Sequence, residues 1–135
     1  MPHVSRNKLS QATEGELIKA LNLVFTKIDK TSEAFAFSNA LLSDTEKLML
    51  AKRLAIVVLL EKNLSDAHIA ESLHVTRITV AKMRYFYEAR GEGFKIALKK
   101  LEEQKQLKSF QDLLLSLAKY SIRAAGGYVK PTILD

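Results

Sequence analysis

Residues 65–86, SDAHIAESLHVTRITVAKMRYF, hold two short amphipathic patterns separated by a gap of three residues. Ile69 and Leu73 lie on the apolar side of the first pattern, and Val80 and Met83 lie on that of the second, at the spacing of helix faces. So short a gap forces two helices to meet at a steep angle. The stretch therefore predicts a corner that presents its second helix to a binding partner.

The residue types at this corner match the requirements of a helix-turn-helix motif. Ala70 is a small residue where the two helices would touch, and Val75 can help to seal the wedge between them. His74 stands at the turn position where glycine is usual, and histidine enters the left-handed region more readily than branched residues do. Ser65 and Thr76 are each positioned to cap the helix that follows them.

Once its apolar side is turned inward, the second helix exposes a face suited to the major groove of DNA. Arg77 is expected to read guanine O6 and N7, and Ile78 and Ala81 to press against a thymine methyl group. Thr76, Thr79 and Lys82 would hold phosphates. Arg84, on a flank of the helix, would contact only the DNA backbone. The predicted DNA-binding residues are Ser65, Thr76, Arg77, Ile78, Thr79, Ala81, Lys82, Arg84 and Tyr85.

Positive charge is concentrated beside the same corner. The chain has a formal net charge of +6 at pH 7, and residues 74–100 hold seven basic and two acidic side chains, a net charge of +5. A basic stripe of this kind fits a polyanionic partner such as nucleic acid, although a solvated helix face explains many charge runs taken alone. Charge supports the prediction of DNA binding without deciding it.

Composition limits the number of domains and the compartment. A chain of 135 residues that is 47% apolar can build one ordinary core and is too short for two comfortable ones. The absence of cysteine excludes disulfides and thiolate metal sites, which favours a reducing cytoplasm. The opening MPHVSRNKLSQ lacks the apolar stretch of a secretion signal, and the longest apolar run, residues 54–60, is far below the roughly 20 residues that span a bilayer. We expect a soluble cytoplasmic protein with no membrane partner.

Nearly every segment has a helical period, which predicts an all-α fold. Thr13 and Glu16 form a capping box that would open the first helix, and TSEAFAFSNALL (31–42) predicts a short second one. Ser43 and Glu46 form another capping box before EKLMLAKRLAIVVLLEK (46–62), which is apolar nearly all round. Such a helix must be enclosed on most sides, and the modest helices around it favour a second subunit as part of its cover.

The C-terminal part predicts an extension of the helical domain. The sequence GEG (91–93) should interrupt the helix that ends the corner, with helix resuming at Phe94. A further amphipathic run begins at Leu107 and continues to about Ala125, before the stop signal of two glycines. It is interpreted as additional cover for a dimer, and the less favoured alternative is a helix for partner binding or higher-order assembly. The expected organisation is an arm at 1–12, the main domain at 13–90, the extension at 91–125 and a tail at 126–135.

From about Thr13 to Arg90 the chain resembles the Trp repressor family. The resemblance lies in the order of the segments, and above all in LLSDTEKLMLAKRLAIVVLLEKNLS (41–65), in which KRLAIV matches the family's central helix and which leads directly into the corner. It covers somewhat over half of the chain. It implies an intertwined homodimer whose two recognition helices face successive major grooves of a palindromic operator, about 34 to 36 Å apart.

The resemblance also implies an effector pocket formed by Ser43, Arg53 and Lys82. Arg53 matches one arginine of the family's tryptophan site and Ser43 its cap position, whereas Lys82 replaces the second arginine. Met83 stands where the family has a glycine that makes room for the ligand. Because lysine does not stack on an aromatic ring as a planar guanidinium does, these changes disfavour tryptophan. We expect either no effector or a different small molecule, with no metal and no other cofactor.

The sequence thus predicts a transcriptional regulator, a repressor that binds double-stranded DNA as a homodimer. One alternative is a helical interaction module that has lost DNA binding. RNA binding is less favoured because the A-form major groove does not admit a helix. Enzyme function lacks support: His68 and His74 do not share a helix face as a metal site requires, and His68 is expected to be an exposed residue of the corner.

Overall fold

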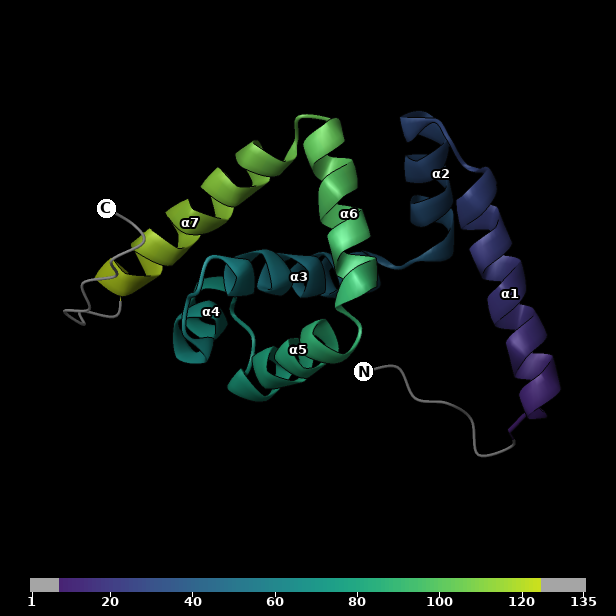
Figure 1. Ribbon diagram of the computed structural model, residues 1–135, viewed down its shortest axis with the longest axis horizontal. Helices are drawn as coiled ribbons and strands as arrows, with labels where there is room; N and C mark the ends of the chain where they lie inside the picture. The colour runs from purple at the N-terminus through teal and green to yellow at the C-terminus, as the bar shows by residue number, and fades with distance from the viewer. Residues whose placement is uncertain (1–7, 125–135) are drawn as a thin grey trace. The chain divides into compact units, whose positions relative to one another are not determined.

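The computed structural model describes residues 8–124, and over that range the protein consists of seven α-helices and no strand (Figure 1). This confirms the predicted all-α class. The chain divides into two compact units, Met1–Asp44 and Thr45–Asp135.

The first unit contains α1 (Gln11–Lys27) and α2 (Thr31–Leu41). The N-cap of α1 is Ser10, whose Oγ accepts a hydrogen bond from the backbone N–H of Thr13 at 3.2 Å. The prediction that Thr13 itself opens this helix was therefore wrong. Ser10 supplies a capping hydroxyl three residues earlier, and the helix begins there.

Neither helix of the first unit buries a side chain completely. Phe25 and Phe37 make an edge-to-face contact with ring centroids 6.0 Å apart, but a pair of helices is too small to enclose the other apolar residues. The large apolar side chains left exposed are Leu9, Leu17, Ile18, Leu21, Leu23, Val24, Phe25, Phe35 and Leu41. This set, the exposed apolar surface of the first unit, is available for further packing.

The second unit holds a well-packed core. It is formed by α3 (Asp44–Glu61), α4 (Asp66–Leu73), α5 (Arg77–Ala89), α6 (Gly91–Glu103) and α7 (Leu107–Ala124). Every residue from 55 to 60 on α3 is buried, whereas Leu48 and Leu50 in its first half are exposed. Within the second unit taken by itself, the prediction of an enclosed central helix therefore holds for its second half.

Helices α5 and α6 meet at a single residue. Arg90 (φ −131°, ψ 32°) ends α5 and begins α6, which starts at Gly91. The expectation that helix would resume only at Phe94 was wrong, because a glycine weakens a helix without preventing one. The break lies at Arg90, and the two glycines occupy the first turn of α6.

The C-terminal helix α7 packs against α4 (Figure 1). Leu114 and Ala118 on α7 are buried in the core, and the ring of His68 on α4 hydrogen-bonds through Nε2 to the carbonyl oxygen of Ala118 at 2.9 Å. His68 is therefore half-buried, not exposed as the sequence suggested. Because its buried side chains belong to the core of the second unit, α7 is an integral part of that unit; the predicted glycine stop and the tail lie outside the described residues.

No helix within residues 8–124 combines the length and the hydrophobicity that crossing a membrane requires.

Candidate nucleic-acid interface

The corner between α4 and α5 is built around a left-handed residue. His74 has φ 54° and ψ 52°, as predicted for the turn position. The backbone N–H of Val75 donates to the carbonyl oxygen of Ala70 at 3.1 Å, which closes the end of α4. The Nζ of Lys52 on α3 donates to the carbonyl oxygen of His74 at 3.4 Å. The turn is thus held to α4 by a backbone hydrogen bond and to α3 by the side chain of Lys52.

Both helices of the corner carry the hydroxyl caps that the sequence predicted. Ser65 Oγ accepts from the backbone N–H of His68 at 3.2 Å, and Thr76 Oγ1 accepts from that of Thr79 at 3.1 Å. The hydroxyl oxygens of Thr76 and Thr79 also lie 2.9 Å apart. These hydroxyl groups therefore already have partners within the corner.

A buried apolar wedge holds α5 at its angle to α4. Ile69 and Leu73 on α4 are buried, as are Val80 and Met83 on α5. Val75 in the turn packs against them and is half-buried. Because these side chains fill the angle between the helices, the opposite side of α5 must face away from the second unit's core.

Five predicted contact residues share that outward side of α5. Arg77, Ile78, Ala81, Lys82 and Tyr85 are all exposed, and the last four have the i, i+3, i+4, i+7 spacing of one helix face. Ile78 and Tyr85 are 69% and 65% exposed, high values for large apolar side chains. We call these five residues the outward face of α5.

Arg84 lies beside the outward face and has a partner within the protein. It forms an ion pair with Asp66, the first residue of α4, and both side chains are partly exposed. A phosphate would have to compete with this carboxylate for the guanidinium. Three other predicted contacts lie outside the face: Ser65 is exposed at the start of α4, Thr76 is exposed at the cap of α5, and Thr79 is half-buried.

The electrostatic character of α5 favours an anionic partner. Its first turn contains no acidic residue, and Glu88 is the single carboxylate between its two ends. Backbone N–H groups at a helix N-terminus and their aligned dipoles add positive potential at the end where Arg77 stands. The outward face therefore combines two side-chain cations with a favourable helix end.

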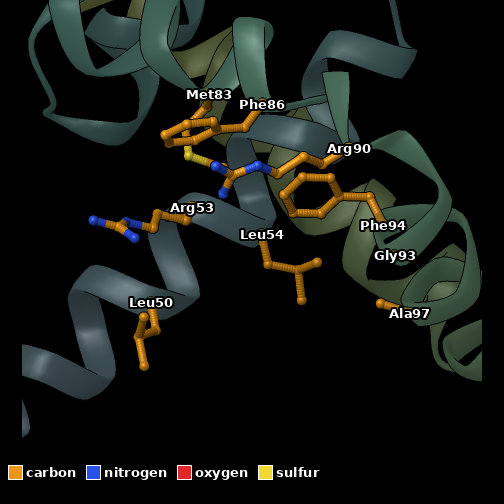
Figure 2. A pocket seen from close by; sticks show the side chains of 9 residues that line it. All are labelled: Leu50, Arg53, Leu54, Met83, Phe86, Arg90, Gly93, Phe94 and Ala97. Atoms are coloured by element: carbon orange, nitrogen blue, oxygen red, sulfur yellow. The ribbon is translucent and has the colours of Figure 1, made fainter. Parts of the chain in front are cut away.

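An open apolar pocket of about 490 Å³ lies between α3, α5 and α6 (Figure 2). Arg53 and Met83 line it, and the guanidinium of Arg90 lies over the ring of Phe86, 4.8 Å from its centroid. Of the three residues predicted for an effector pocket, Arg53 is in the lining of this one. Lys82 is exposed on α5 and is not in the lining, and Ser43 belongs to the first unit.

Three features of the second unit were not anticipated from the sequence. They are the pairing of Asp66 with Arg84, the contact of Lys52 with the turn, and the pocket wall formed by Phe86, Arg90 and Phe94. The wall has a signal in the sequence, since these three residues recur every four positions. Lys52 also had a signal in the sequence, because it is a charged residue within a helix that is apolar nearly all round.

Searches of the chain against protein-family models, curated proteins and solved structures find no match.

Proposed function

We propose that this protein binds double-stranded DNA as a transcriptional regulator, a repressor, with α4 and α5 acting as a helix-turn-helix. The observation that carries the proposal is the outward face of α5, which is held away from the core by the buried wedge and has cations but no carboxylate among its five residues. A recognition helix needs this combination, because it must enter a groove lined by phosphates while its own domain stays clear of the duplex.

The residues of the corner divide into two roles in this proposal. Arg77 stands at the N-terminal end of α5, the end that reaches base edges in helix-turn-helix proteins, and its guanidinium suits guanine O6 and N7. Lys82 and the start of α4 at Ser65 contact phosphates, which sets the orientation of the protein without reading sequence.

We also propose that the DNA-binding form is a homodimer. The support is the exposed apolar surface of the first unit, which its two helices are too few to enclose, together with Leu48 and Leu50, which are exposed on α3 of the second unit. A second copy of the chain presents the same apolar surfaces. A symmetric dimer would therefore bury the exposed apolar side chains of both copies against each other. The resemblance to the Trp repressor family suggests the intertwined form of such a dimer and a palindromic operator.

The oligomeric state is tested by sedimentation of the wild type and of two variants on α1. We expect a dimer for the wild type and a shift towards monomer for Leu21→Glu, which places a charge in the apolar surface. Lys19→Glu, an exposed position of the same helix, is the matched control and should remain dimeric. A wild-type monomer at micromolar concentration would rule out the dimer.

DNA binding is tested by selecting bound sequences from a pool of random duplexes. We expect enrichment of a site with two inverted half-sites about one helical turn apart, and affinity that falls steeply as salt is raised. A pool that stays random after repeated rounds would contradict sequence-specific binding.

A helical protein-interaction module is the second candidate function. The observation that favours it is the apolar character of Ile78 and Tyr85 on the outward face, which would also suit a protein partner. The two candidates separate in one experiment, because an interaction module should fold and assemble normally and yet bind no duplex at any salt concentration.

A further inference from the structure

The centre of the outward face of α5 is apolar and its two edges are basic. At the helical rotation of 100° per residue, Ile78, Ala81 and Tyr85 project from the middle of the exposed arc. Arg77 and Lys82 project from opposite sides of that middle. Side chains at the centre of a recognition helix lie nearest the floor of the groove. Lys82, at one edge, lies nearest the phosphates, whereas Arg77, at the other edge, is a long side chain at the N-terminal end of the helix, the end that reaches base edges.

Few polar groups of α5 remain to read base edges. The hydroxyls of Thr76 and Thr79 are engaged at the helix cap, and Arg84 is paired with Asp66. The helix RITVAKMRYFYEA contains neither asparagine nor glutamine, the side chains that pair with both hydrogen-bonding groups of adenine. Readout by hydrogen bonds is thus left mainly to Arg77.

The major groove offers one apolar group that distinguishes base pairs, the C5-methyl of thymine. We propose that α5 reads this methyl group through Ile78, so that the bound half-site carries a thymine opposite this side chain. Ile78 is the most exposed large aliphatic side chain described in the protein, and it lies in the first turn of α5 at the end that enters the groove. Arg77 and Lys82 flank it with the charge that draws the helix to DNA. The inference rests on the proposed DNA binding and names the chemical group that gives it specificity.

The experiment uses the duplex obtained by selection from the random pool. Each thymine is replaced in turn by deoxyuridine, which removes only the C5-methyl group and leaves every hydrogen-bonding group in place. Binding of each duplex is measured by fluorescence anisotropy at one fixed salt concentration. At one thymine in each half-site we expect the wild type to lose about fourfold in affinity, the effect of one methyl group returned to water.

The variant Ile78→Ala identifies the side chain that makes the contact. It should bind the thymine duplex more weakly than the wild type and should not distinguish thymine from deoxyuridine at the sensitive position. The matched control is Ile96→Ala, the same truncation at a 54% exposed isoleucine on α6, which should retain the wild-type discrimination.

Each outcome has a definite meaning. If no duplex is bound at any salt concentration, the proposed function and this inference both fail. If the protein binds DNA but no deoxyuridine substitution weakens binding, methyl readout fails and DNA binding stands. If discrimination persists in Ile78→Ala, another residue reads the methyl group and the assignment to Ile78 is overturned.

Discussion

The guanidinium of Arg84 on α5 donates a hydrogen bond from Nε to Oδ1 of Asp66 on α4 at 3.0 Å. This pair joins the two helices of the corner beside the outward face of α5. It has two opposite effects in the proposed function, because it helps to hold the corner together while it occupies a cation that could otherwise contact phosphate.

Replacing Asp66 with asparagine should separate these two effects. Both side chains are partly exposed, so the loss of the pair should lower the free energy of unfolding by only about 0.5 kcal/mol in urea denaturation. DNA affinity should rise, because Arg84 is released and a negative charge beside the duplex is removed. Glu71→Gln, an exposed charge change on the same helix, is the control for net charge. If Asp66→Asn bound DNA more weakly than the wild type, the proposed position of Arg84 and Asp66 beside the DNA would be contradicted.

His74 should respond to substitution according to its left-handed backbone. Glycine adopts this conformation without strain, so His74→Gly should leave the free energy of unfolding unchanged or raise it by up to about 1 kcal/mol. His74→Val should lower it by about 1 to 2 kcal/mol, because a β-branched residue is strained there. Thermal and urea unfolding of the two variants measure the difference. Equal stability of the two variants would exclude a left-handed residue at this turn.

Two adjacent leucines on α7 provide a matched test of the packing of this helix. Leu114 is 3% exposed and Leu113 is 57% exposed. Leu114→Ala should lower the free energy of unfolding by about 2 to 4 kcal/mol, because it leaves a cavity in the core. Leu113→Ala should lower it by less than about 1 kcal/mol. If the two variants were equally stable, α7 would not be part of the core of the second unit.

Tyr87 should make stability depend on alkaline pH. Its hydroxyl donates to Glu61 Oε1 at 2.8 Å, and this hydrogen bond, with burial and the charge of Glu61, raises the pKa of Tyr87 above its usual value of 10.0. The folded state therefore holds this proton more tightly than the unfolded state does. The resulting stabilisation is fully present below pH 10 and is lost as the pH rises through the raised pKa.

The variant Tyr87→Phe tests this effect. It should be less stable than the wild type by about 0.5 to 1 kcal/mol at pH 7, because it loses one hydrogen bond. The difference in the free energy of unfolding should shrink as the pH rises above 10. A difference that stayed constant up to pH 11 would show that the hydrogen bond to Glu61 does not control it.

The local structure of the corner could be predicted because it depends on near neighbours in the sequence. The caps at Ser65 and Thr76 join residues three positions apart, and the left-handed turn at His74 follows from the gap between two apolar patterns. The start of α1 was misassigned because two hydroxyl residues, Ser10 and Thr13, compete for the same capping role.

Contacts between distant parts of the chain could not be predicted. The hydrogen bond from His68 to Ala118 joins residues 50 positions apart, and the pair of Asp66 and Arg84 spans 18. Helical periodicity shows which side of each helix is apolar, but not which helix will cover it. The amphipathic pattern of α7 therefore predicted a covered face without identifying α4 as its partner.

The most direct test of the proposed function is duplex binding by two double variants that lose the same charge. One carries Arg77→Ala and Lys82→Ala on the outward face of α5, and the other carries Lys99→Ala and Lys100→Ala, exposed positions on α6. Affinity for the selected duplex is measured across a range of salt concentrations. We predict that the first variant loses at least about tenfold in affinity and has a shallower salt dependence, whereas the second stays close to the wild type. Equal binding by both variants would show that α5 is not the helix that contacts DNA.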